Sequence, residues 1–196
     1  MTIWYAIYCS SEKEQKFLQV CQQHVSKEVL QDAFVFTYDR MRRYEGAWHL
    51  ERQKMFPGYV FLESGNPGQL IQEMRRIPYL DKILVGHGAI IPLKQGEELF
   101  LRRLCGEGHH FGMSRGYIQN GRTFVTEGPL QGQEQLIRKI DRHKRVARVR
   151  MPEDRLDFAC TQLDRENARD KGTGIEMNFP KGLRELQMGL EIVSKS

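Results

Sequence analysis

The sequence lacks most of the features that mark a metalloprotein, a secreted protein or a membrane protein. Its 196 residues include four cysteines (Cys9, Cys21, Cys105 and Cys160), and no two of them form a CxxC pair. No apolar run approaches the roughly 18 residues that a membrane helix needs. The first residues carry no basic segment ahead of an apolar run, so we expect no secretory signal. These absences predict a cytoplasmic protein with reduced thiols and no membrane contact.

Catalytic motifs are missing as well. The patterns GxxxxGK[ST], GxSxG and HExxH do not occur, and no Cys and His residues have the spacing of metal ligands. His109 and His110 lie in a glycine-rich stretch, where we interpret them as a solvated pair. We therefore expect a protein that is not an enzyme and that binds no metal or cofactor.

What the sequence does contain is an ordinary globular composition with one concentration of positive charge. Hydrophobic residues make up 40% and charged residues 28%, which suits one large domain or two small ones. The net charge is +5, and residues 138–150 alone hold seven Lys and Arg against one Asp. Concentrated charge of this kind favours a polyanionic partner. A solvated hairpin without a partner is the alternative.

Hydrophobic periodicity in the first half predicts alternating strands and helices. The predicted elements are strand 2–9, helix 10–25, strands 33–44 and 49–63, helix 66–77, strand pieces 80–86 and 89–93, and helix 94–105. Without the last helix, this order is β-α-β-β-α-β, the ferredoxin-like split βαβ arrangement of an α+β domain. With both crossover helices on one face of the sheet, we expect the other face to be free.

A second domain is predicted downstream. Residues 106–116 are rich in glycine and lack periodicity, which predicts a flexible linker between domains 1–105 and 117–196. Short strands separated by glycine turns then predict a small β-barrel, with no conversion of this half to helix. The charged segment 151–174 does not fit a barrel strand, and we interpret it as an insertion in a loop. This leaves open whether 146–151 or 175–179 forms the fourth strand.

Three segments resemble the NusG family of transcription elongation factors. They are WYAIYCSSEKEQKF (4–17), KMFPGYVFLE (54–63) and VTEGPLQGQEQLIRKIDRHKR (125–145). The first two resemble the N-terminal (NGN) domain of that family, and the third resembles its C-terminal KOW barrel. The GPLQG turn followed by IRKIDRHKR is similar to the LoaP-type specialised antiterminators. The resemblance implies a two-domain transcription elongation and antitermination factor.

The FPGY motif gives this resemblance a physical basis. Pro57 and Gly58 interrupt a strand that is flanked by aromatic residues. We expect them to bend it so that Phe56, Tyr59 and the nearby Tyr8 line a shallow apolar basin on the free face. The resemblance implies that Tyr8, Phe56, Pro57 and Tyr59 dock on the clamp helices of the largest subunit of RNA polymerase. The alternative is that these rings fill the hydrophobic core.

Basic residues are the candidates for nucleic-acid contacts. In the first domain the resemblance places them beside non-template DNA, and the candidates are Arg40, Arg42, Arg43, Arg75 and Arg76. In the second domain it implies binding of a nascent RNA hairpin, and the candidates are Arg138, Lys139, Arg142, His143, Lys144 and Arg145. Such an arginine-rich surface suits A-form RNA, which is recognised through backbone and shape. A partner protein is the alternative for the second set, and we expect the chain itself to be a monomer.

A different class of protein shares the first domain's element order. An RNA-recognition motif has the same β-α-β-β-α-β order, with aromatic residues on its first and third strands. In that interpretation Tyr8, Tyr59 or Phe61 would stack on bases of single-stranded RNA. Pro57 stands where that motif has a glycine, and the motif does not account for the downstream strands.

Overall fold

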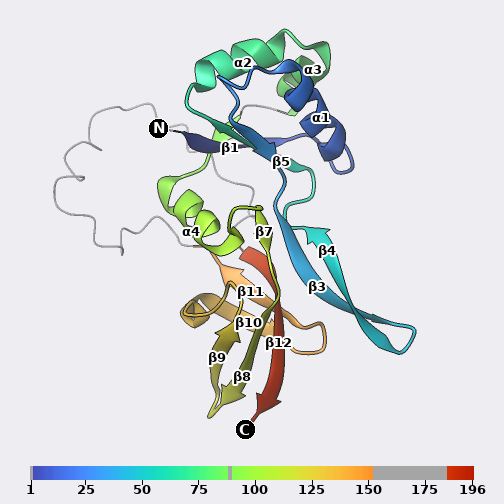
Figure 1. Cartoon of the computed structure of the whole chain (residues 1–196), viewed down its shortest axis with the longest axis vertical. Helices are drawn as coiled ribbons and strands as arrows, with labels where there is room; N and C mark the ends of the chain where they lie inside the picture. Colours follow the sequence, from blue (N-terminus) through green and yellow to red (C-terminus); the bar gives the residue numbers. More distant parts are fainter. Residues whose placement is uncertain (1, 88–89, 152–184) are drawn as a thin grey trace, which may run out of the picture.

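The computed structural model describes residues 2–87, 90–151 and 185–196 (Figure 1). A layered α+β half lies at one end of the molecule and a β-sheet half lies at the other. None of the helices in these ranges is both long enough and apolar enough to cross a membrane. The predicted insertion 151–174, apart from Met151, and the candidate strand 175–179 lie outside the described residues.

The first half is built on a four-stranded antiparallel sheet with the strand order β2-β5-β1-β6. Its strands are β1 (Ile3–Tyr8), β2 (Asp32–Phe34), β5 (Tyr59–Ser64) and β6 (Ile91–Pro92). Helices α1 (Glu14–His24), α2 (Pro67–Arg75) and α3 (Pro78–His87) cover one face (Figure 1). Because β5 lies between β1 and β2, the connectivity is that of a split βαβ unit. The predicted α+β class and ferredoxin-like order are confirmed for this half.

Residues 80–86, predicted as a strand piece, belong to helix α3 instead. Pro78 begins this helix, where its missing N–H removes no intrahelical hydrogen bond. Leu80 and Ile83 are buried three residues apart, as expected on one helix face. A short apolar run fits either a strand or a helix, and here the prediction was wrong. Within the described residues, Ile91–Pro92 is the strand that completes the sheet.

The second face of the sheet, predicted to be free, is covered. Helix α4 (Gln95–Cys105) lies on it, and Trp4 of β1 is only 1% exposed. The guanidinium of Arg102 lies 3.9 Å from the centre of the Trp4 ring and forms ion pairs with Glu63 (2.9 Å) and Glu98 (2.8 Å). The prediction failed because α4 has an apolar face of its own, which has to be buried against another layer.

The stretch 33–44, predicted as one strand, is divided in two. After β2 the chain leaves the sheet, and β3 (Thr37–Tyr44) pairs with β4 (Ala47–Lys54) in a long hairpin. Glu45 and Gly46 close this hairpin with φ values of 52° and 78°. Two successive left-handed residues are what a type I′ turn requires, so the predicted turn at EGAW is confirmed. The long hairpin extends from the first half alongside the second (Figure 1).

The second half is a five-stranded sheet with the order β10-β11-β12-β8-β9. Its elements are β8 (Ser114–Gln119), β9 (Arg122–Glu127), the 3-10 turn η1 (Glu134–Leu136), β10 (Ile137–Asp141), β11 (Val146–Arg150) and β12 (Glu185–Lys195). The strands predicted within residues 121–151 and at the end of the chain are confirmed by β9, β10, β11 and β12, whereas β8 begins inside the predicted linker. No α-helix occurs in residues 114–151 or 185–196. The order leaves β9 and β10 at its two ends, so a closed barrel stays a prediction.

The segment 106–116, predicted as a flexible linker, is fixed to the first half through residues 109–111, and its last residues begin β8 of the second half. Strand β7 (His110–Phe111) pairs in parallel with β3, and Phe111 is fully buried. The ring of His109 lies 3.4 Å from that of Phe34 (between centroids), and its Nε2 lies 3.3 Å from Asp32. His109 and Phe111 therefore pack among aromatic rings of the first half and hold this part of the chain in place. The glycine content of the segment gave no indication of this packing.

His110 is held in a similar way. Its Nδ1 lies 2.8 Å from Thr37 Oγ1, and its Nε2 lies 3.1 Å from Asp39 Oδ1. The two histidines are thus placed by neighbouring strands of the first half, and the prediction of a solvated pair was wrong.

Candidate protein-docking and nucleic-acid interfaces

The FPGY motif forms a tight turn before β5. The Tyr59 N–H donates to the Phe56 carbonyl over 3.1 Å, with Pro57 and Gly58 as the central residues. Gly58 has a φ of 85°, and a Cβ on it would lie 2.5 Å from Cε2 of Tyr8. Proline followed by a left-handed glycine is the sequence of a type II turn. The Pro-Gly pair therefore reverses the chain and lets the Tyr8 ring lie directly against the backbone.

A buried carboxylate supports this turn from below. Glu14, in the first turn of α1, is only 1% exposed. One of its oxygens accepts the Gly58 N–H at 2.7 Å, and the other accepts from Lys54 Nζ at 3.0 Å. Burial alone would raise the pKa of Glu14, but these hydrogen bonds and the Lys54 charge hold the pKa below its ordinary value. The sequence indicated only an acidic residue near a helix start, so this support was missed.

The rings around the turn divide into exposed and buried ones. Tyr8 is 38% exposed, Tyr59 is half-buried, and their centroids lie 5.1 Å apart. Pro57, the second residue of the turn, is also exposed. We call Tyr8, Pro57 and Tyr59 the aromatic rim. Phe56 is instead 7% exposed and packs against Phe61, so its expected place on the surface is corrected to a place in the core.

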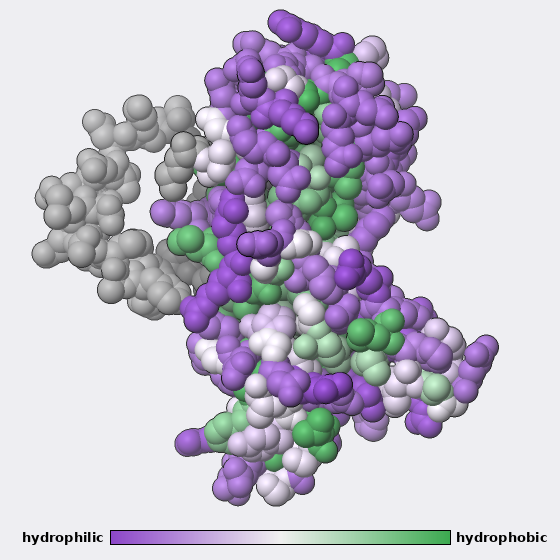
Figure 2. Space-filling view, in the orientation of Figure 1, coloured by the Kyte–Doolittle hydropathy of each residue, from purple (hydrophilic) through white to green (hydrophobic). Residues whose placement is uncertain are grey.

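The aromatic rim is small, and among the described residues the other rings of the covered face do not extend it at the surface. Trp4, Phe36 and Phe61, which share that face, are each 1% exposed. Figure 2 shows hydrophobic surface only in separate areas between hydrophilic side chains in this view. A partner would therefore meet two tyrosines and a proline rather than a wide apolar hollow.

In the second half, β10, β11 and their turn form what we call the basic hairpin, residues 137–150. Five of its six predicted RNA-contacting residues are exposed, and they are Arg138, Lys139, Arg142, His143 and Lys144. Arg145 differs, because it is half-buried and already engaged. Its guanidinium forms an ion pair with Glu191 (2.6 Å) and lies 4.0 Å from the centre of the Trp48 ring.

The Arg145 contacts join the two halves of the molecule. Trp48 belongs to the long hairpin, and Glu191 belongs to β12. At another point between the halves, the Tyr38 hydroxyl of β3 donates to Gln187 of β12 over 3.4 Å. We call the Trp48–Arg145–Glu191 group the clasp. One continuous buried cluster, which includes Trp4 from the first half and Leu190 from the second, also connects the halves.

The candidate arginines of the first half do not come together at one place. Arg40, Arg42 and Arg43 lie on β3 in the long hairpin, and Arg42 forms a 3.4 Å ion pair with Glu51. Arg75 and Arg76 lie at the end of α2, on the far side of the sheet from the long hairpin (Figure 1). A single nucleic-acid strand would therefore meet these two groups separately.

No group of three metal-ligating side chains occurs in the described part of the chain. The fold and the two surfaces thus define a class: an α+β protein with an N-terminal split βαβ domain that carries an aromatic rim, and a C-terminal β-sheet that carries a basic hairpin.

A family model described as "Transcription termination factor nusG" matches residues 2–100, which is half of the chain, and the chain therefore belongs to the NusG family. Members of this family are transcription factors that interact with RNA polymerase. A solved structure described as "Domain interaction in Thermotoga maritima NusG" is similar over 98% of this chain and 94% of that one, with 15% identity and a TM-score of 0.44. No curated protein matches the sequence.

Proposed function

We propose that this protein is a transcription elongation and antitermination factor that docks on RNA polymerase through the aromatic rim. The partner surface would be the clamp helices of the polymerase's largest subunit. The observation that carries the proposal is the pair of the exposed Tyr8 and the half-buried Tyr59, which lie against a turn that Glu14 fixes from within the fold. A rim prepared in this way loses little conformational entropy when a helical hairpin covers it.

The interaction would be mainly apolar. Covering the part of each tyrosine ring that is still accessible would contribute roughly 1–2 kcal/mol. Aromatic residues at the centre of an interface often dominate the binding free energy. Tyr8 and Pro57 of the rim are exposed with the second half in place, so docking does not require the halves to separate. Phe56 would contribute indirectly, because its buried ring holds the turn against the core.

The test is binding of the full-length chain to core RNA polymerase without nucleic acid. For the double variant Tyr8→Ala, Tyr59→Ala we expect a loss of affinity on the order of 100-fold or more, because two ring burials are removed. Tyr44→Ala is the matched control, since Tyr44 is 45% exposed at the end of β3 and outside the rim. Wild-type affinity in the double variant would refute docking through the rim.

The second half would supply the specificity. We propose that its five strands form a KOW barrel of the LoaP type and that the basic hairpin binds nascent RNA. Arg40, Arg42, Arg43, Arg75 and Arg76 would make further backbone contacts to the non-template DNA strand. The protein would act as a monomer by binding alone, without a chemical step or a cofactor.

The alternative of an RNA-recognition motif has less support. Base stacking needs aromatic side chains on an open sheet face, but α4 covers that face and Phe61 is only 1% exposed. If short single-stranded RNA bound with an affinity that depended on Tyr8 and Tyr59, this alternative would be favoured over polymerase docking.

A further inference from the structure

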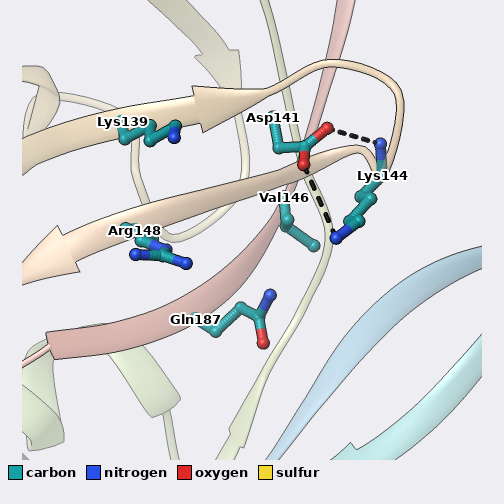
Figure 3. Close-up of a pocket in the computed structure, with 6 residues that line it drawn as sticks. All are labelled: Lys139, Asp141, Lys144, Val146, Arg148 and Gln187. Carbon is teal, nitrogen blue, oxygen red and sulfur yellow. Dashed lines mark hydrogen bonds and ion pairs between the residues drawn. The ribbon is translucent and has the colours of Figure 1, made fainter.

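Three neighbouring strands of the second half place a row of polar side chains side by side. Lys139 of β10 is the register partner of Arg148 of β11, and Arg148 is the partner of Gln187 of β12. Register partners on antiparallel strands project from the same face, with Cβ atoms about 5 Å apart. Together with Lys144 from the β10–β11 turn, these side chains line a small pocket of about 60 Å³ (Figure 3).

The charges around this pocket are unbalanced. Neither Lys139 nor Arg148 forms an ion pair with any residue that the structure describes, although the two are direct cross-strand neighbours. Like charges in such a position destabilise a sheet. The acidic residue of the lining is Asp141, whose carboxylate accepts the Lys144 N–H at 2.9 Å and lies 4.0 Å from Lys144 Nζ. Three cations therefore share one carboxylate, which leaves the pocket suited to an anion.

The side-chain amide of Gln187 is oriented to donate hydrogen bonds into the pocket. Its Oε1 accepts from the Tyr38 hydroxyl, so the amide oxygen is directed toward the first half. Figure 3 shows the amide nitrogen on the side of Val146 and Asp141, with the oxygen turned away from them. The amide thus offers N–H donors to the pocket, and a neutral donor beside two cations is a common arrangement around phosphate oxygens.

We propose that Lys139, Lys144 and Arg148, with the Gln187 amide, bind a backbone phosphate of a structured nucleic acid. This inference rests on the RNA-binding role proposed above and narrows it from the whole basic hairpin to one face. It adds Arg148 and Gln187 to the candidates and removes Arg145, whose guanidinium is held in the clasp.

The lining favours a nucleic acid over an acidic protein. Protein interfaces are usually anchored by aromatic or large apolar side chains. Here the apolar lining consists of Val146, which is buried, and the remaining residues are charged or amide. The pocket, at about 60 Å³, is also too small to enclose a base, so we expect it to contact a backbone group instead.

The experiment measures fluorescence anisotropy of a labelled RNA stem-loop with the full-length chain over a salt series. For the triple variant Lys139→Gln, Lys144→Gln, Arg148→Gln we expect roughly a tenfold or greater loss of affinity and a salt slope reduced by about one, because the lost contact to one phosphate removes about 0.7–0.9 from the slope. A DNA hairpin of the same sequence forms the second arm. Equal binding of both would assign the phosphate to nucleic acid in general, and tighter RNA binding would assign it to RNA.

The control is a triple variant with the same change in net charge at exposed residues elsewhere, Lys27→Gln, Arg103→Gln and Arg122→Gln. We expect it to lose less than threefold, since only long-range attraction is weakened. Gln187→Glu supplies an independent check, because a carboxylate in the row would repel phosphate without removing a cation. Circular dichroism confirms that each variant is folded.

Two outcomes would overturn the proposal: equal losses in the two triple variants, or unchanged affinity in Gln187→Glu. Displacement of the RNA by poly-glutamate at matched charge concentration would also count against it, because it would indicate an acidic protein as the occupant. None of these results depends on the polymerase. Failure here therefore leaves docking through the rim to be judged separately, and loss of docking leaves the phosphate pocket intact.

Discussion

In the first half, the aromatic rim presents short, rigid side chains on a turn whose backbone is fixed by a buried carboxylate. In the second half, the pocket of Lys139, Arg148 and Gln187 presents long polar side chains on regular strands, where register brings them together, and Lys144 joins them from the β10–β11 turn. One surface depends on what is packed beneath it, and the other depends on charge. They should therefore respond to different perturbations: the rim to changes inside the fold, and the pocket to salt.

The largest expected effect removes the support under the rim. Glu14→Ala leaves the buried Gly58 N–H without its acceptor, and we expect a loss of roughly 2–4 kcal/mol in the free energy of unfolding. Urea unfolding measures this loss, and a binding assay should show weaker polymerase docking although Glu14 touches no partner. Glu14→Gln keeps an acceptor for the N–H and should lose less.

A matched substitution in the second half sharpens this contrast. Glu134 also accepts a backbone N–H, that of Val125 at 3.0 Å, but it is only half-buried. Water can replace it, so Glu134→Ala should cost about 1 kcal/mol. If the two alanine variants lost the same stability, the rim would not depend on its buried support in the way we infer.

A smaller effect is expected at the clasp, where the two regions meet. Arg145→Ala removes the partly buried ion pair with Glu191 and the contact with Trp48, which we expect to cost about 1–2 kcal/mol. A double-mutant cycle with Trp48→Ala isolates the cation–π contact between the halves. A coupling energy of zero in that cycle would show that the long hairpin and the basic hairpin do not interact in solution.

The sequence predicted the strand order of the first half because its hydrophobic periods are long and end at clear turn residues. Asn66-Pro67 and Glu45-Gly46 carry local backbone preferences that tertiary structure did not override. The helix at 78–87 was missed because four apolar residues within seven positions fit both periods. What covers the second face of the sheet depends on contacts between distant segments, and no local pattern encodes those.

In the candidate sites, too, the sequence predicted the local features and missed those that depend on contacts between distant segments. The Pro-Gly turn was readable because only glycine tolerates its φ. The burial of Phe56 was not readable, since an aromatic residue beside a turn has the same sequence signal whether it faces solvent or core. In the basic hairpin the concentration of charge was evident. Its division into the Lys139–Arg148 row and the engaged Arg145 follows from strand register, which residue types alone do not specify.

The smallest expected effect concerns pH and the segment that joins the two regions. Burial lowers the pKa of His109 and outweighs the opposing charges of Asp32 and Glu63, while Arg102 lowers it further. The unfolded chain, with a pKa of about 6.5, therefore takes up this proton before the folded chain does. The stability that neutral His109 contributes is full above about pH 7 and declines as the pH falls through about 6.5 toward the folded-state pKa.

Urea midpoints of wild type and His109→Gln between pH 7.5 and 5.5 measure this contribution. As the pH falls, the urea midpoint should decline less in His109→Gln than in wild type. His143→Gln, which alters an exposed histidine of the basic hairpin, should show the same decline as wild type. Glu14 does not interfere, because its lowered pKa makes its own contribution disappear only below about pH 4.5. An unchanged slope in His109→Gln would mean that this histidine is hydrated in the folded protein, and that the segment 106–116 leaves its aromatic site in solution and behaves as the flexible linker that its glycines suggest.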